Sequence, residues 1–239
     1  MTRLALAAAA ALVALPLQAQ ELTDARVKEL ALEAILENPA IVMEAVALLQ
    51  QQEQEAARDA ASSALGGDLV AALESGENAP VLGNPEGDVT VVEFFDYNCP
   101  YCRRAAPVLE EVLAADGGVR AVMREWPILG EGSVFAARAA LAAREQGLYR
   151  ELHDAMMAAS GRLGEAEVMA LAAEAGLDAE RLRADMESPE IDAHFERSHA
   201  LASAMGFSGT PSFVVGETAA PGLVPAEQLL EMIAARRAE

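Results

Sequence analysis

The sequence predicts an α/β fold that is interrupted by a helical block and preceded by a helical arm. Residues 88–96 (DVTVVEFFD) are rich in β-branched and aromatic residues, a second strand is expected at 119–126 before Pro127, and a helical pattern at 103–115 lies between them. This is the strand–helix–strand order of an α/β unit. Residues 132–206 contain no convincing strand and break into helices at several glycines and at Pro189, and a strand pattern returns at 212–215. The α/β unit is therefore split, and a last helix fits residues 225–237.

Composition and charge narrow the class of protein. The chain has 239 residues, of which 53% are hydrophobic and 23% are charged, and its formal net charge is −21. This is the composition of a globular protein with a sizeable core. Binding to nucleic acid needs a basic face, so nucleic acid is not an expected partner. The acidic residues are spread along the chain, which favours a role in solubility over a dedicated surface for basic partners.

The N-terminus has the pattern of a secretory signal peptide at residues 1–19. Arg3 supplies the positive charge, residues 4–17 form an unbroken apolar run, and Leu17-Gln18-Ala19 resembles a cleavage site. The run is shorter than the roughly 20 residues that a membrane-spanning helix needs, although an uncleaved anchor is the alternative. We therefore expect an exported protein.

Residues 20–78 are predicted to form a helical arm and a linker. Asp24 is a candidate N-cap for a first helix, and Pro39 fits the first position of a second helix. Serine and glycine at 62–67 and again at 75–79 are typical of linkers. An apolar stripe follows the arm, and it is too narrow to form a core alone, so we expect it to pack against the same arm of another chain in a homo-oligomer; it consists of Val27, Leu30, Ala34, Val42, Val46 and Leu49.

The rest of the chain is divided at the helical block. We assign residues 79–131 to the first part of the α/β domain, 132–206 to the inserted helical domain, and 207–239 to the second part of the α/β domain.

The chemistry is expected at Cys99-Pro100-Tyr101-Cys102, which follows the first strand and begins a helix. A bridge between Cys99 and Cys102 closes almost no loop, so it contributes little to stability. A thiolate at a helix N-terminus is stabilised by unpaired N–H groups, which should lower the pKa of Cys99 below about 8.5. Cys102 lies one turn later and can resolve a mixed disulfide, while Pro100 suits an early helical position. The pair therefore predicts disulfide exchange.

The two cysteines allow three other interpretations. A zinc site would need further ligands, and His194 and His199 are distant in sequence and lie on different faces of a helix. A purely structural disulfide is disfavoured by the short loop. Two thiolates could instead hold Cu(I), which soft ligands select. The three histidines, including His153, are interpreted as surface residues of the helical block.

Two further signals lie outside the cysteine pair. Glu93 stands inside the apolar run 91–95, where burial should raise its pKa and make it a proton acceptor for Cys102. The alternative is that Glu93 points to solvent, and Arg124 is a candidate ion partner. Thr210-Pro211 precedes the strand at 212–215, and a trans bond is the default for the residues taken alone.

Together these residues resemble the DsbA family of thioredoxin-fold proteins. The resemblance rests on VVEFFDYNCPYC at 91–102, on GTPSF at 209–213, and on the helical insertion between them. It implies a thioredoxin-like fold in the periplasm, with Pro211 as a cis-proline beside the active-site disulfide. It also implies that Thr210 presents backbone groups to an extended substrate and that Glu93 is the family's buried acid.

The resemblance also bears on the direction of the reaction. The strong oxidases of the family carry Pro-His between the cysteines, whereas Pro100 and Tyr101 tune the pair differently here and favour an isomerase-like role. The arm is similar to the stalk of the ScsC and Com1-like branch. Expected partners are exported substrate proteins with cysteines and a membrane redox partner that recycles the pair. No cofactor and no metal is expected, and the alternatives are a dithiol oxidase or a Cu(I)-binding copper-tolerance protein.

Overall fold

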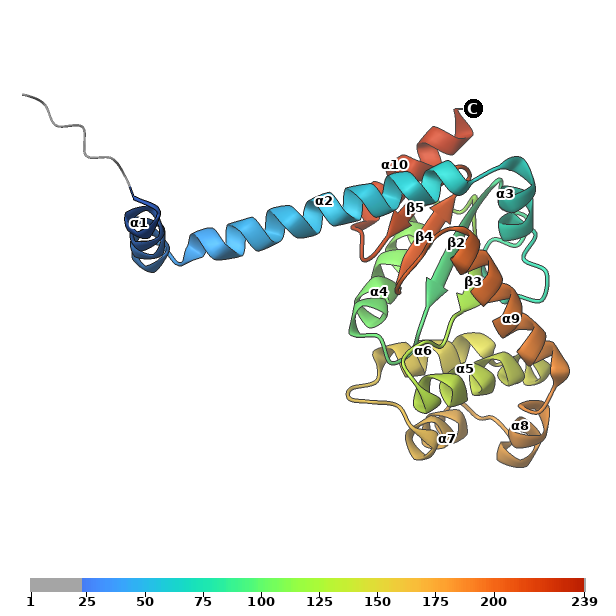
Figure 1. Cartoon of the computed structure of the whole chain (residues 1–239). Coiled ribbons are helices and arrows are strands. Elements are labelled where there is room, and N and C mark those ends of the chain that lie inside the picture. Colours follow the sequence, from blue (N-terminus) through green and yellow to red (C-terminus); the bar gives the residue numbers. More distant parts are fainter. Residues whose placement is uncertain (1–22, 239) are drawn as a thin grey trace, which may run out of the picture. The chain divides into compact units, whose positions relative to one another are not determined.

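The computed structural model describes residues 23–238, so the predicted signal peptide lies outside the described residues. The chain divides into two units, Met1–Leu49 and Gln50–Glu239. No helix in residues 23–238 is long and apolar enough to cross a membrane. Figure 1 shows the order of the elements along the chain.

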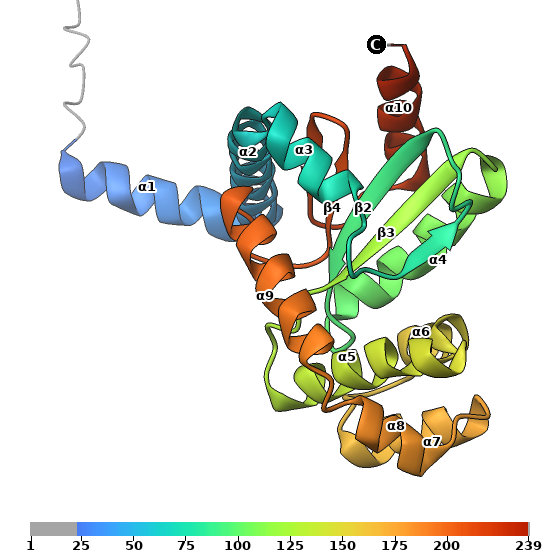
Figure 2. The same cartoon turned by 90° about the vertical axis from the view of Figure 1, so that its right-hand side faces the viewer.

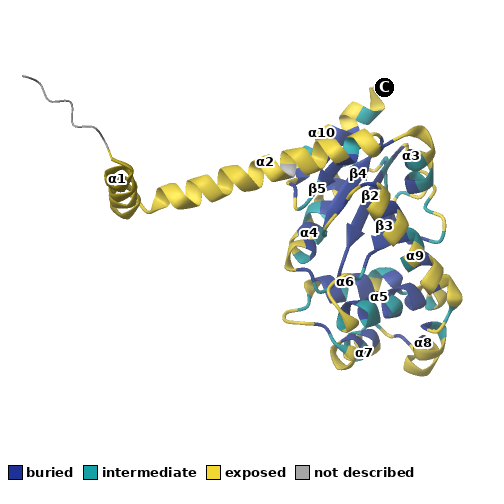
Figure 3. Ribbon diagram, viewed as in Figure 1, coloured by how far each residue is buried: buried dark blue, intermediate teal, exposed yellow. Residues whose placement is uncertain are grey.

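The first unit contains α1 (Asp24–Glu37) and the first part of α2 (Ala40–Ala64). The N-cap of α1 is Thr23, whose hydroxyl accepts a hydrogen bond from the Arg26 N–H at 3.4 Å, so the expectation that Asp24 is the cap is wrong. None of the residues of α1 is buried, as Figure 3 shows. The large apolar side chains that this unit exposes include most of the predicted stripe: Val27, Leu30, Leu32, Ile35, Leu36, Ile41, Val42, Met43, Val46, Leu48 and Leu49.

The second unit is built on a five-stranded sheet with the order β1-β3-β2-β4-β5. The strands are β1 (Val81–Gly83), β2 (Val89–Phe95), β3 (Val119–Glu125), β4 (Ser212–Val215) and β5 (Thr218–Pro221). Only β2 and β3 are parallel, and α4 (Pro100–Ala115) connects them. The central strands are buried on both faces because helices cover each side, which explains their continuous apolar runs. The thioredoxin-like fold is therefore confirmed.

Two hydrophobic clusters lie on opposite faces of the sheet because side chains alternate along each strand. Val91 and Phe95 pack in the cluster that contains α4 and α10 (Ala226–Arg237). Val92 and Phe94 pack in the cluster that contains α3 (Gly67–Glu74) and α9 (Pro189–Ala204). Figure 2 shows the sheet with helices on both sides.

The helical block follows β3 and consists of α5 (Glu131–Ala143), a 3₁₀ turn (Arg144–Gln146), α6 (Tyr149–Ala158), α7 (Glu165–Glu174) and α8 (Ala179–Asp185). Helix α5 is buried along most of its length, and six of its buried residues are alanines, whose small side chains let neighbouring helices approach closely. The block shares its core with the face of the sheet that carries α4. It is therefore packed against the cysteine-bearing helix.

The segment between α2 and β1 is better ordered than its composition predicts. Serine and glycine at 62–67 and 75–79 predicted a linker, but α2 continues to Ala64 and α3 follows at Gly67. Leu65, Val70 and Leu73 are buried in the cluster that α9 shares. These residues therefore belong to the core of the second unit.

We expect the Leu73→Ala variant to lose about 2–5 kcal/mol of unfolding free energy, because Leu73 is fully buried and its removal leaves a cavity. The half-buried Leu69 on the same helix provides the control, and Leu69→Ala should lose much less. Urea unfolding followed by circular dichroism measures both. Equal, small losses for the two variants would show that α3 is a loosely attached linker.

Candidate active site

The chain turns sharply between β2 and α4, and the carboxylate of Asp96 holds this turn. Asp96 is buried, and its Oδ1 accepts the N–H of Asn98 at 2.7 Å. Its Oδ2 accepts the N–H groups of Ile128 and Leu129 at 2.9 and 3.0 Å. Asp96 is not recognisable from the sequence, because its three partners come from two loops that only the fold brings together. The turn delivers Cys99 to the N-cap position of α4, with Pro100 at the next position.

The Cys99 thiol has the environment of an ionised group. Its pKa is lowered to about 5, mainly by a hydrogen bond from Cys102 and further by Thr210 and by the N–H groups of Cys102 and Tyr101, against an opposing effect of burial. Its Sγ lies 3.3 Å from the carbonyl oxygen of Thr210. The residue is 5% exposed, so its sulfur is only narrowly accessible.

The Cys102 thiol lies in the opposite environment. It is 0% exposed, and its Sγ accepts the N–H of Asp96 at 3.5 Å. Burial raises the pKa of Cys102 strongly, and the neighbouring Cys99 and Glu93 raise it further. At neutral pH the two sulfurs therefore differ in charge, Cys99 being a thiolate and Cys102 a thiol.

Glu93 is buried beneath this pair, which excludes the alternative that it points to solvent. It is 2% exposed, burial raises its pKa to about 8, and its Oε1 has no hydrogen-bond partner among the described residues. Arg124 is not its ion partner. The register aligns Glu93 with Met123 and Phe94 with Arg124, so the two charged side chains leave opposite faces of the sheet. One guanidinium nitrogen of Arg124 instead donates to the carbonyl oxygen of Glu77 at 3.2 Å.

The other predicted residues lie at the rim of the same site. The Thr210–Pro211 peptide bond is cis, in agreement with the family resemblance, and β4 begins immediately after it. Tyr101 is 54% exposed on the first turn of α4, and the guanidinium of Arg104 lies 4.4 Å from the centre of its ring. The contact between Cys99 and Thr210 thus joins two segments that are 111 residues apart in the sequence.

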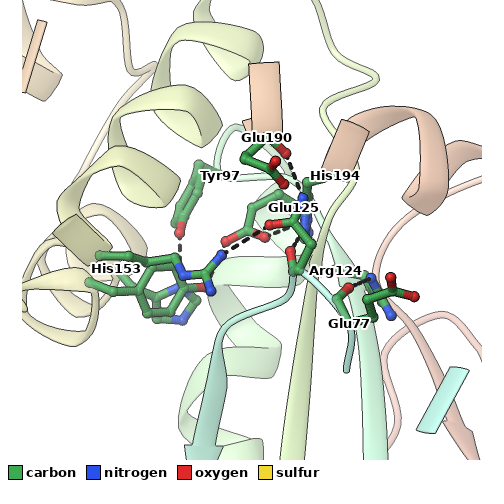
Figure 4. A network of polar contacts seen from close by, with 10 residues as sticks. Glu77, Tyr97, Arg124, Glu125, His153, Glu190 and His194 are labelled. Carbon is green, nitrogen blue, oxygen red and sulfur yellow. Dashed lines mark hydrogen bonds and ion pairs between the residues drawn. The ribbon is translucent and has the colours of Figure 1, made fainter. Parts of the chain in front are cut away.

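A buried polar network lies beside the site and ties the helical block to the sheet (Figure 4). The Tyr97 hydroxyl lies 2.9 Å from Nδ1 of His153, which stacks on Tyr149. Tyr149 donates to Oε1 of Glu125 at 2.7 Å. His194 Nε2 lies 2.8 Å from Glu125 Oε2. The network therefore connects α6, β3 and α9 with the turn that precedes Cys99.

The positions of the histidines correct the expectation that all three are surface residues. His153 and His194 are buried, and only His199 is exposed. His194 Nδ1 lies 2.6 Å from the carbonyl oxygen of Asn78, so Nδ1 carries a proton. His194 Nε2 accepts the backbone N–H of Glu125 at 3.1 Å, so both ring nitrogens are held by backbone groups. Burial lowers the pKa of His153 to about 4, so it is neutral at physiological pH.

Within residues 23–238, no group of three or more histidine, cysteine, aspartate or glutamate side chains is arranged to hold a metal ion. His194 is engaged by Glu125 and Asn78 rather than turned toward the cysteines. The arrangement is instead that of a nucleophilic thiolate with a buried resolving thiol and a buried carboxyl.

We expect Cys99, in a Cys102→Ser variant, to be alkylated by iodoacetamide with a rate that is half-maximal near pH 5, because the thiolate is the nucleophile. In a Cys99→Ser variant, Cys102 should react slowly and only at alkaline pH. Rates measured from pH 4 to 9 compare the two. A faster reaction of Cys102 below neutral pH would reverse the assignment.

Replacement of Glu93 with glutamine should change how stability depends on pH. Between pH 4.5 and 8 the folded protein binds the Glu93 proton more tightly than the unfolded chain, so ionisation of this carboxyl lowers stability as pH rises through that window. Glutamine does not ionise, so the Glu93→Gln variant should gain about 1–3 kcal/mol over the wild type between pH 5 and 8.

Urea unfolding of the oxidised proteins measures this difference, because the thiols do not titrate in that form. His153 also makes the unfolding free energy depend on pH, with the opposite sign, but this contribution is the same in both proteins and cancels in the difference. A difference between variant and wild type that stays constant from pH 5 to 8 would contradict the assignment.

Comparison with known proteins agrees with this geometry. The model of the DSBA-like thioredoxin domain matches residues 90–234. A thioredoxin-like oxidoreductase from Silicibacter pomeroyi DSS-3 is 57% identical, with a TM-score of 0.70, over 71% of this chain and 98% of that chain. The catalytic domain of ScsC from Proteus mirabilis is 26% identical, with a TM-score of 0.66, over 74% of this chain and 99% of that chain.

Curated relatives include the Na(+)/H(+) antiporter NhaA 3 of Salinispora tropica, which is 36% identical over 56% of this chain. The chain spans 21% of that antiporter's length. The thiol:disulfide interchange protein DsbA of Bordetella parapertussis is 28% identical over 58% of this chain and 68% of its own length. Because the matched domain covers more than half of the chain, the chain belongs to the DSBA-like thioredoxin-domain family.

Proposed function

We propose that this chain is a periplasmic enzyme that exchanges disulfides in exported proteins through Cys99 and Cys102, mainly as an isomerase. The observation that carries the proposal is the contrast between the two sulfurs, one with its pKa lowered to about 5 and the other enclosed with a raised pKa. A reduced pair of this kind attacks disulfides at neutral pH without any activation step.

The chemistry begins when the Cys99 thiolate attacks one sulfur of a substrate disulfide. The substrate S–S bond breaks, a mixed disulfide forms with Cys99, and the second substrate sulfur leaves as a thiolate. In isomerisation that thiolate attacks another disulfide of the same substrate, and a substrate thiolate finally displaces Cys99, which returns the enzyme reduced. Alternatively, the mixed disulfide is resolved within the enzyme: Cys102 loses its proton and attacks the Cys99 sulfur, which releases a reduced substrate and leaves the enzyme oxidised.

Glu93 is proposed to accept the Cys102 proton when Cys102 resolves the mixed disulfide. Its pKa of about 8 lets the carboxyl both take and release a proton near neutral pH, and its charge is felt by the Cys102 thiol. Thr210 and Pro211 are proposed to position an extended substrate segment beside Cys99, and Pro100 and Tyr101 to tune the pair.

Localisation and recycling follow from the predicted signal peptide. The N-terminal pattern predicts export, and a periplasmic thioredoxin-like protein from Salmonella enterica serovar Typhimurium is 27% identical over 73% of this chain. An isomerase must be kept reduced in an oxidising compartment, so we propose a membrane redox partner that reduces the Cys99–Cys102 pair.

The arm supports a homo-oligomer. The apolar side chains of α1 and the first part of α2 are exposed, and an exposed apolar surface of this extent is typical of an interaction site. Two or more catalytic sites on one stalk would act on a misfolded substrate at high effective concentration. We propose that the isomerase activity depends on this assembly.

Deletion of residues 20–49 tests the assembly and its role together. The deletion stops at Leu49 because Gln50 begins the second unit. We expect light scattering of the mature protein to give a multiple of the monomer mass, and the deletion variant to be a monomer. The variant should still reduce a peptide disulfide but should lose most of its ability to reactivate scrambled ribonuclease. The inactive Cys99→Ser protein is the control.

A monomeric mass of the mature protein at micromolar concentration would contradict the assembly. It would favour the second candidate, a dithiol oxidase, which the lowered pKa of Cys99 also supports because it stabilises the reduced pair. The redox state of the pair in cells separates the two functions, since an isomerase is held reduced and an oxidase is held oxidised. Copper content after purification tests the Cu(I) alternative.

A further inference from the structure

A groove with a volume of about 640 Å³ lies beside the reactive cysteine. One side of it is formed by Thr210 and Pro211, and Cys99 contacts this side through the Thr210 carbonyl oxygen. Another side is formed by the second half of α2, through Gln50, Glu53 and Ala57. This part of α2 precedes the family domain, which matches residues 90–234.

The wall that α2 contributes is anchored to the sheet. Ala61 and Leu65, at and just after the end of α2, are buried in the cluster that α3 and α9 share. The Ser62 hydroxyl accepts the N–H of Ala219, in β5, at 3.2 Å. Residues 50, 53 and 57 are three and four positions apart, so they lie on one face of this continuous helix. The anchor therefore fixes which side chains face the groove.

The floor and rim of the groove are apolar near the cysteine. Tyr101, Phe207, Pro211 and Leu223 contribute to its lining, and Tyr101 and Leu223 are exposed. An extended segment with an apolar residue next to its cysteine therefore fits this surface.

The groove is lined by two charged residues, Glu53 and Arg104, which differ in their contacts. The Arg104 guanidinium is stacked on the ring of Tyr101 at 4.4 Å. Glu53 lines the groove and makes no hydrogen bond or ion pair with any other residue in the described part of the chain. Arg104 likewise makes no ion pair among the described residues, so the two charges differ in that the Arg104 guanidinium is stacked on an aromatic ring and the Glu53 carboxylate has no contact partner. The net charge of the chain, −21, adds to the negative potential at Glu53.

We infer that Glu53 on α2 is a specificity-determining residue, which selects extended cysteine-bearing segments that carry a lysine or arginine near the cysteine. The inference rests on the proposed function, because the segment would be the substrate that forms the mixed disulfide with Cys99. It gives α2 a role in substrate choice that is separate from its role in assembly.

Reduction of peptide homodisulfides tests the inference with the full mature chain. The peptides share an apolar residue beside the cysteine and differ at one neighbouring position, which is lysine, glutamine or glutamate. Reduced enzyme attacks the symmetric disulfide, and resolution by Cys102 releases both peptides as thiols. Glutathione then re-reduces the enzyme and is oxidised, and glutathione reductase with NADPH reports the rate.

The wild type should reduce the lysine peptide with a kcat/KM about two- to five-fold above that of the glutamate peptide, the effect of a solvent-exposed ion pair. Glu53→Gln should bring this ratio close to one, and Glu53→Lys should invert it. The matched control is Glu55→Gln, two residues along α2, because Glu55 accepts a hydrogen bond from Gln51 at 2.9 Å and does not line the groove. Its ratio should equal that of the wild type.

Two results would overturn the inference while leaving the proposed function intact. One is an unchanged preference in Glu53→Lys. The other is a preference for the glutamate peptide that Arg104→Gln abolishes, which would assign selection to Arg104. If the wild type reduces none of the peptides, the proposed function itself is contradicted.

Discussion

The constraint on which the site depends is the difference in solvation between two sulfur atoms three residues apart. The turn held by Asp96 delivers Cys99 to the start of α4, where hydrogen-bond donors surround its sulfur. One helical turn later, Cys102 is enclosed between the helix and the sheet, with the Glu93 carboxyl as its neighbour. Since the backbone of one helix fixes both positions, the charge difference is built into the fold and needs no substrate to create it.

The buried acids of this chain show how a structural carboxyl differs from one that is free to titrate. Asp96 accepts three backbone N–H groups, and Glu125 is held by Tyr149 and His194. Such contacts compensate the cost of burying a polar group. Glu93 makes no hydrogen bond or ion pair among the described residues, so its proton is held by desolvation alone. This is why Glu93, rather than its better-connected neighbours, is suited to proton transfer.

Much of the second unit could be predicted from the sequence, because β2 and β3 carry continuous apolar runs and α4 and α10 carry apolar residues at helical spacing. The short strand β4 is marked by the Gly209-Thr210-Pro211 sequence that precedes it. Strands β1 and β5 have three and four residues and pair only at the edges, so they give almost no pattern. Helix α3 begins at Gly67, directly after Gly66, and this pair of glycines is typical of a linker rather than of a helix. The cysteines and Glu93 were found from local context, whereas Asp96 and Glu125 depend on partners that are distant in sequence. His153 and His194 were misjudged because polar residues in an amphipathic helix usually face water.

The reduction potential of the Cys99–Cys102 pair, titrated against glutathione between pH 6 and 7, tests the central claim most directly. If Cys99 is already a thiolate and Cys102 a thiol, reduction of the disulfide takes up one proton with two electrons. The potential should then fall by about 30 mV per pH unit. A fall of about 60 mV per pH unit would mean that both thiols are protonated in this range, and it would contradict the unequal environments described for the two sulfurs.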